Sequence, residues 1–283
     1  MSETPPLFWC LGGVLVDHIG RTHAPVQTGQ SNPGAARLTP GGVALNISRA
    51  LANGGADVAL MSAVGRDIGA ELIKAALDAA GIEDQMIRTD HPTGAYLAIE
   101  DASGDLHAGV SDLTALETLP TDAIVAHLAQ APTHARLVID ANLTPDQQFK
   151  AAARPGWLAA EAVSAPKAQR LIPLLPSLNA LFCNLSEASV LGASAETAKD
   201  AAKGLTGNTD AIVFVTNGPC PAAVAKGDED WTLQPPAIPP ASVTGAGDAF
   251  TAAALLALAT DATPEQALGA AITAASALLE TSL

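Results

Sequence analysis

Short apolar segments alternate along this chain with amphipathic segments of helical spacing, and this alternation limits the folds open to it. Residues 7–17, LFWCLGGVLVD, are typical of a buried strand that ends at paired glycines and an acid. Residues 41–55 and 67–81 carry apolar residues at helical spacing and end at glycines. Further strand-like segments follow at 136–140, 179–184 and 211–216, before two apolar C-terminal helices. The pattern favours an α/β fold in which helices flank a layered sheet.

Two segments break this alternation. Residues 18–40 are polar and rich in turn-forming residues, and residues 94–112 are typical of a hairpin that turns at Ser103 and Gly104. We expect strands from about 14–40 and 88–113 to form a small separate sheet that acts as a lid. The whole chain, residues 1–283, is then predicted to be one domain with this lid attached.

The charge of the chain excludes several classes of partner. There are 14 Lys and Arg residues against 29 Asp and Glu, a net charge of -15, which argues against binding to nucleic acid or to an anionic membrane surface. The N-terminus lacks a basic region, and the apolar runs are too short to span a bilayer, so a cytoplasmic location is predicted. The three cysteines lack metal-ligand spacing.

The stretch VTGAGDAF at 243–250 places an acid where a glycine turn becomes a helix. Such a helix start presents unpaired N–H groups, and Gly245 and Gly247 let an anion approach the backbone closely. Asp248 then lies in the first helical turn, where it can deprotonate a hydroxyl that attacks a phosphoryl group. The alternative is a glycine turn followed by an acid that favours the helix dipole. A P-loop is absent, and the stretch lacks the third glycine of a dinucleotide-binding motif.

This stretch and several others together resemble the ribokinase-like (PfkB) carbohydrate and nucleoside kinases. The resemblance implies a ribokinase-like three-layer α/β/α sandwich with a mostly parallel central sheet and a small β lid. It also implies that Asp248 is the catalytic base and that Gly245, Ala246 and Gly247 form the anion hole. The matching stretches occur in the family's order: GGVLVD, GGVALN, AVGRDIGAELIKAALDAAGI, NLSE at 184–187, VTNG at 215–218, and TGAGD.

Within this family, residues 31–52, 94–113, 140–143 and 163–171 most resemble the pseudouridine kinases. That resemblance implies ATP-dependent phosphorylation of the 5'-hydroxyl of pseudouridine. Three alternatives stay open: a sugar kinase acting on ribose or fructose, a kinase for another nucleoside, and a sensor that binds such ligands without catalysis.

Three positions near the N-terminus match residues that hold the sugar hydroxyls in this family. They are Asp17, Gly42 and Asn46. A carboxylate can accept two hydroxyl protons, and an amide both donates and accepts, so the residue types suit the task. Without the resemblance, Asp17 is an acid at a strand end and Asn46 is a helix amide facing solvent.

Four positions match the part of the family site that binds the nucleotide. Asn184 and Glu187 match the Asn-x-x-Glu motif, which implies that they help to position Mg2+ and the phosphates of ATP, mostly through water. Taken alone, the same residues form an N-terminal helix cap. Thr216 and Gly218 match the strand end where ATP lies, and a β-turn is the alternative interpretation.

Several positions are left open by the resemblance. Tyr96 and Asp112 lie in the expected lid, where they would contact the base or cover the sugar, although Tyr96 equally suits the lid interior. Lys167 could meet a phosphate or be an exposed helix lysine. Ser242 replaces an aspartate found in many relatives, which leaves a potassium requirement open. Residues 157–162, WLAAEA, lack the Asp-Pro expected there, so this wall of the site is less defined.

The lid also predicts an assembly. A small sheet attached to one side of the domain would expose apolar surface, and pairing of two lids would cover it. We therefore expect a homodimer formed through the lid, with a small nucleoside or sugar as the substrate.

Overall fold

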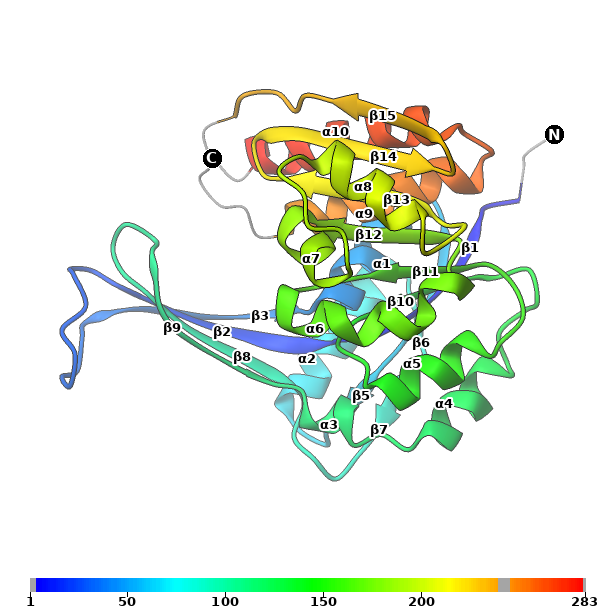
Figure 1. Cartoon of the computed structure of the whole chain (residues 1–283). Helices are drawn as coiled ribbons and strands as arrows, with labels where there is room; N and C mark the ends of the chain where they lie inside the picture. Colours follow the sequence, from blue (N-terminus) through cyan, green and yellow to red (C-terminus); the bar gives the residue numbers. More distant parts are fainter. Residues whose placement is uncertain (1–3, 239–244, 282–283) are drawn as a thin grey trace.

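The central sheet has nine strands, in the order β15-β14-β13-β12-β11-β10-β1-β4-β6. The strands from β13 to β6 are parallel, and β14 and β15 are antiparallel strands at one edge. The computed structural model describes residues 4–238 and 245–281, and Figure 1 shows the whole arrangement. The strands are β1 (Leu7–Leu11), β4 (Asp57–Met61), β6 (Glu83–Asp84), β10 (Arg136–Asp140), β11 (Leu158–Glu161), β12 (Ala180–Asn184), β13 (Ile212–Asn217), β14 (Cys220–Lys226) and β15 (Glu229–Leu233).

Helices cover both faces of this sheet, because alternate strand residues point to opposite sides. Phe8 and Cys10 of β1 join the core on one side, whereas Trp9 and Leu11 join the core on the other. The first side is covered by α1 (Val43–Asn53), α2 (Ile68–Ala80), α9 (Ala246–Ala259) and α10 (Pro264–Thr281). The second side is covered by α3 (Thr114–Glu117), α4 (Thr121–Leu128), α5 (Pro145–Ala152), α6 (Ala165–Ala168), the 3-10 helix η1 (Gln169–Ser177), α7 (Leu185–Val190) and α8 (Ala198–Thr206). The predicted three-layer α/β/α sandwich is confirmed.

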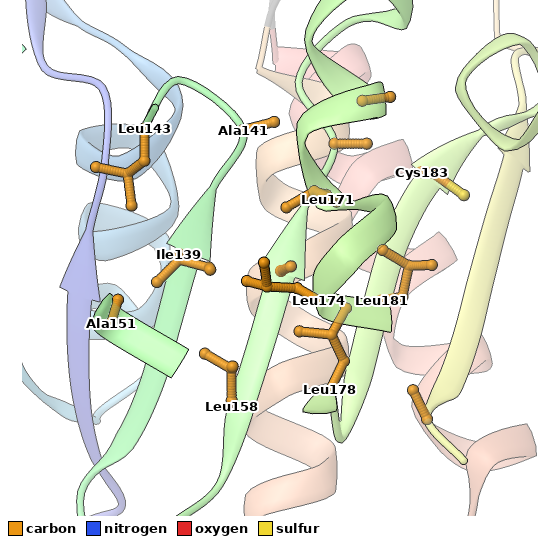
Figure 2. Close-up of a cluster of buried hydrophobic side chains, with 14 of the residues drawn as sticks. Ile139, Ala141, Leu143, Ala151, Leu158, Leu171, Leu174, Leu178, Leu181 and Cys183 are labelled. Atoms are coloured by element: carbon orange, nitrogen blue, oxygen red, sulfur yellow. The ribbon is translucent and has the colours of Figure 1, made fainter. Parts of the chain in front are cut away.

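The interior is filled mainly by aliphatic side chains. Figure 2 shows the core on the second side, where Ile139 and Leu181 from the sheet meet Leu171 and Leu174 from η1. On the first side, Phe182 and Phe214 stack with their ring centroids 4.9 Å apart. No helix in the described ranges is both long enough and apolar enough to cross a membrane.

A second sheet of four strands extends away from this body (Figure 1). Its order is β3-β2-β8-β9, with β2 parallel to β8 and the other two pairs antiparallel. Its strands are β2 (Leu15–Thr22), β3 (Gly34–Gly41), β8 (Ala95–Glu100) and β9 (Leu106–Asp112). The β8–β9 turn contains Gly104, at a φ of 90°, as the predicted hairpin requires. A short parallel pair, β5 (Ala63–Val64) and β7 (Ile87–Arg88), lies apart from both sheets.

The single strand predicted over residues 7–17 is in fact two strands in two sheets. The chain leaves β1 at Gly12 and enters β2 at Leu15. A Cβ atom at Gly12 would overlap the carboxylate of the buried Asp140, and one at Gly13 would overlap the amide of Asn142. The paired glycines therefore let the chain pass close to the end of β10 while it changes sheets.

Candidate active site

The ends of three parallel strands, β11, β12 and β13, and the starts of α1 and α9 line one pocket. Strands β1, β10, β11, β12 and β13 all finish at the same edge of the sheet, where ligands of open α/β folds bind. The pocket has a volume of about 150 Å³. It is lined by Val43, Glu161, Val163, Phe182, Cys183, Asn184, Glu187, Thr216, Gly247, Asp248, Phe250 and Thr251.

The start of α9 is open toward this pocket. Gly245 precedes the helix in the left-handed region, with a φ of 84°, and no side chain among the described residues caps the helix. A Cβ atom at Gly247 would meet nothing within 4 Å, so the described chain leaves space beside the first helical amides. Ala246 begins the helix, as the sequence predicts. This arrangement can accept an anion at the positive end of the helix.

Asp248 lies in the first turn of α9 and faces a partner from the other end of the chain. The Nδ2 atom of Asn46, in α1, donates a hydrogen bond to its Oδ2 atom at 2.8 Å. The pKa of Asp248 is raised to about 7, chiefly by burial; the Asn46 hydrogen bond opposes this rise, and the charge of Asp140 contributes to it. A carboxyl group that titrates near neutral pH in a pocket is suited to exchange protons with a bound hydroxyl.

The position of Asn46 depends on how α1 begins. Gly42 precedes that helix at a φ of 102°, and a Cβ atom there would overlap the carbonyl oxygen of Gly13. The same carbonyl accepts a hydrogen bond from the N–H of Ala44 at 3.2 Å. Gly42 therefore allows α1 to begin directly against the turn after β1, which brings Asn46 to Asp248. The alternative interpretation, in which Asn46 is a helix amide that faces solvent, does not account for its hydrogen bond to Asp248.

Glu161, at the end of β11, also lines the pocket, and sequence reasoning missed it. The hydroxyl of Thr251, one turn after Asp248, donates to its Oε2 atom at 2.7 Å. Burial raises the pKa of Glu161 well above its ordinary value, and the charges of Glu187 and Asp248 add to this shift. The sequence did offer one signal for this residue, because Glu161 is a single acid at the end of the apolar run LAA.

The chain makes a tight turn directly after Glu161. Val163 has a φ of 69°, which is unusual for a β-branched residue, and the N–H of Ser164 donates to the carbonyl of Ala162 at 2.8 Å. These features define a strained γ-turn. The strain lies at the wall of the pocket, which Val163 lines.

The Asn-x-x-Glu residues form a helix cap and line the pocket as well. The Oδ1 atom of Asn184 accepts from the N–H of Glu187 at 2.9 Å, and the Oε2 atom of Glu187 accepts from the N–H of Asn184 at 2.8 Å. Burial raises the pKa of Glu187. Thr216 lines the pocket too, whereas Gly218 lies outside the lining, in the turn that joins β13 to β14 at a φ of 55°.

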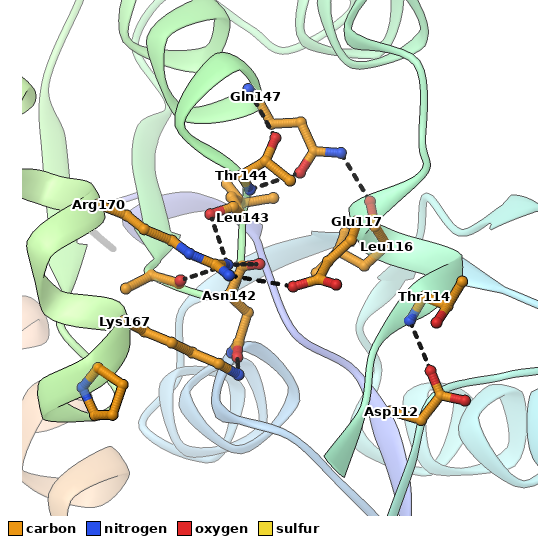
Figure 3. Close-up of polar contacts among 12 residues, drawn as sticks. Asp112, Thr114, Leu116, Glu117, Asn142, Leu143, Thr144, Gln147, Lys167 and Arg170 are labelled. Carbon is orange, nitrogen blue, oxygen red and sulfur yellow. Dashed lines mark hydrogen bonds and ion pairs between the residues drawn. The ribbon is translucent and has the colours of Figure 1, made fainter.

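The predicted lid residues lie in the second sheet and its base. Asp17 pairs in register with Tyr96, and a Cβ atom at Gly41 would overlap its carboxylate. The hydroxyl of Tyr96 would lie 2.8 Å from a Cβ atom at Gly109, so its ring covers that glycine. Asp112 is exposed and accepts a hydrogen bond from the N–H of Thr114 at 2.9 Å (Figure 3).

None of these last residues lines the pocket around Asp248. Burial raises the pKa of Asp17, and the nearby charges of Arg37 and His18 oppose this shift. Its carboxylate lies beside Gly41, one residue before the glycine that begins α1. Asp17 is therefore close to the helix that carries Asn46. Ser242, the position on which the potassium question rests, lies outside the described residues.

The pfkB family carbohydrate kinase model matches residues 7–283, and the chain belongs to this family. Kinases of this family are phosphotransferases that use ATP and Mg2+ and act on alcohol groups. The predicted family is thus confirmed.

The chain is also similar to individual proteins. The chain is 26% identical over 254 residues to the pseudouridine kinase of Escherichia coli (strain K12), with 86% of this chain and 80% of that protein covered. It is 29% identical to a carbohydrate kinase from Agrobacterium tumefaciens, with a TM-score of 0.84 and coverage of 96% of this chain and 90% of that one. The ribokinase of Thermotoga maritima is 19% identical, with a TM-score of 0.80 and coverage of 98% and 96%, which confirms the ribokinase-like fold.

The Asn46–Asp248 contact predicts a measurable titration. Asp248 should titrate near pH 7, and Asn46→Ala should raise its pKa further, because the lost hydrogen bond stabilises the carboxylate. Carbon-detected NMR of the Asp side chains measures both values. Asn208→Ala, at an exposed position, should leave the pKa unchanged. An Asp248 pKa that falls in Asn46→Ala would contradict the assignment.

Proposed function

We propose that this chain transfers the γ-phosphoryl group of ATP to the 5'-hydroxyl of pseudouridine. The observation that carries the catalytic part is Asp248, a partly buried acid with a raised pKa at the uncapped start of α9. Similarity to the pseudouridine kinase of Escherichia coli supports the substrate, together with the matching stretches at 31–52 and 163–171.

The proposed chemistry follows from the arrangement around α9. The hydroxyl oxygen of the acceptor attacks the γ-phosphorus while the bond to the ADP oxygen breaks, and the hydroxyl proton passes to Asp248. The backbone amides of residues 245–247 stabilise the charge on the transferring group. Because Asp248 acts as a base, kcat/KM should fall as the pH drops below about 7.

The donor set of the pocket fits a magnesium ion bound together with phosphates. Three acids line it, Glu161, Glu187 and Asp248, and among the described residues that line it there is no Lys, Arg or His. A polyphosphate beside these acids needs a cation to offset the repulsion. Across the described ranges, no cluster of three or more His, Cys, Asp or Glu side chains could hold a metal by itself. Asn184 and Glu187 would therefore hold Mg2+ partly through water molecules, and phosphate oxygens would complete its coordination shell.

The acceptor would lie between the second sheet and the start of α1. Asp17, Gly42 and Asn46 would hold its sugar hydroxyls, and Tyr96 would cover it from the sheet. In the register of the second sheet, Asp17 and Tyr96 share one face with Ala98, which is buried, so this face is turned toward the body of the protein. Asp112 accepts a hydrogen bond from the N–H of Thr114 and would lie at the border of this region.

A sugar kinase is the second candidate. It is favoured by the similarity to the carbohydrate kinase from Agrobacterium tumefaciens, at 29% identity over nearly the whole chain. A sensor without catalysis is disfavoured, because Asp248 keeps the partner and the raised pKa of a working base.

The proposed base predicts the effect of one substitution. Asp248→Asn should lower kcat on pseudouridine by about 100- to 10,000-fold, because the amide cannot accept the hydroxyl proton. The rate is measured as ADP release with Mg-ATP. Asp228→Asn, at an exposed acid of the same type, should keep the wild-type rate.

The same assay on pseudouridine, uridine, adenosine, ribose and fructose tests the substrate. Turnover that strongly favours pseudouridine supports the proposal. Preference for ribose or fructose would retain the mechanism and replace the substrate. Near-normal turnover by Asp248→Asn would refute the assigned base.

We also propose that the chain forms a homodimer through its second sheet. The outer face of this sheet carries exposed apolar side chains, with Leu97 50% and Val110 61% exposed. Leu38, Leu97 and Val110 stand in one cross-strand row, in register with His18. Ile99 continues the patch along β8. A second copy of this sheet would cover such a surface.

The dimer predicts a change in mass on substitution of this row. Wild-type protein at micromolar concentration should scatter light as a dimer, and Leu97→Lys with Val110→Lys should scatter as a monomer, because buried charges oppose the contact. Phe149→Lys, at an exposed apolar residue of α5, should remain dimeric. A monomeric wild type would contradict the proposed dimer.

A further inference from the structure

Lys167 lies at the same sheet edge as the pocket, and the mechanism proposed above does not use it. Its Nζ atom donates a hydrogen bond to Oδ1 of Asn142 at 2.5 Å (Figure 3). An ammonium group has three hydrogens to donate, and the described residues offer this one no second acceptor within hydrogen-bonding distance. Asn142 is itself buried. The side chain is thus not the freely exposed helix lysine that was one expectation from the sequence.

The lysine is not needed to hold the loop that it touches. Arg170 already binds this loop, because its Nη1 atom lies 3.4, 3.0 and 3.3 Å from the carbonyl oxygens of Ala141, Asn142 and Leu143. Its Nη2 atom also pairs with Glu117 at 3.3 Å (Figure 3). Burial lowers the pKa of Lys167, and the charge of Arg170 acts in the same direction. Lys167 is thus a partly buried cation whose surroundings disfavour its charge and whose ammonium group has donors to spare. Such a group is suited to donate hydrogen bonds to a ligand.

A chain of contacts joins Lys167 to the region proposed for the acceptor. The amide of Asn142 packs against the Cα atom of Gly13. Gly13 in turn donates to Asp140 at 2.8 Å and accepts from Ala44, at the start of α1, at 3.2 Å. Lys167 follows Val163, which lines the pocket, but does not line the pocket itself. Its contacts through Asn142 and Gly13 instead connect it to the start of α1, where the acceptor is proposed to bind.

We propose that Lys167 determines base specificity by donating a hydrogen bond to a carbonyl oxygen of a pyrimidine-dione base. This inference rests on the proposed nucleoside kinase function. The charge of the nearby Asp140 already offsets part of the lysine charge, which favours a neutral acceptor over a second phosphate. Uracil carries two such carbonyl oxygens, whereas adenine and a free sugar carry none. The residue would thus select pseudouridine and uridine over adenosine.

Lys167→Met tests this role, because methionine keeps much of the apolar stem and removes the donors. We expect kcat/KM on pseudouridine, and its affinity measured by calorimetry, to fall by about 10- to 100-fold, as for a lost hydrogen bond from a charged group. Kd for adenosine should change by less than about threefold. Lys167→Arg keeps donors and should recover part of the loss. Lys150→Met is the matched control at an exposed lysine, and Tm of each variant verifies folding.

The outcomes separate this inference from the proposed function. Equal losses for pseudouridine and adenosine, or none for pseudouridine, would overturn the role of Lys167 even if wild type phosphorylates pseudouridine. Selective loss of pseudouridine binding without wild-type turnover would support base recognition and refute the proposed reaction. A wild type that binds neither nucleoside would overturn both.

Discussion

The hydrogen bond between Asn46 and Asp248 connects two helices that lie 202 positions apart in sequence, and the candidate site depends on it. Each helix begins after a glycine with a positive φ, Gly42 for α1 and Gly245 for α9, and neither has a side-chain cap. Their open ends meet at the carboxyl edge of the sheet. The same hydrogen bond limits how far burial can raise the pKa of Asp248, which keeps this group able to ionise near neutral pH.

Acids surround this contact, and their arrangement explains what the pocket can bind. Glu161 and Glu187 line the pocket together with Asp248, and within the described part of the chain no lining residue carries a positive charge. Burial raises the pKa of Glu161 and of Glu187, so the surroundings of these two acids disfavour their charged forms. A ligand that brings its own cation relieves this repulsion. The side chains of Lys167 and Arg170 are instead bound to the loop after β10.

Much of the fold could be predicted from the sequence, because apolar spacing reports directly on buried faces. The strand and helix alternation predicted the sandwich, and the position of Asp248 at a helix start followed from its glycines. Spacing does not report contacts between distant segments, so the hydrogen bond between Asn46 and Asp248 was not predicted. Glu161 was missed because a lone acid after alanines looks like an ordinary strand end. The strand over 7–17 was wrongly joined because Gly12 and Gly13 change the sheet without breaking the apolar run.

The central claim is that the start of α9 holds the transferring phosphoryl group while Asp248 receives the proton of the acceptor. A crystal structure with pseudouridine, Mg2+ and a non-hydrolysable ATP analogue tests it most directly. We expect the 5'-oxygen within about 2.6–3.2 Å of an Asp248 carboxylate oxygen, with the γ-phosphate against the first amides of α9. An acceptor hydroxyl bound away from Asp248, or a γ-phosphate held elsewhere, would contradict it.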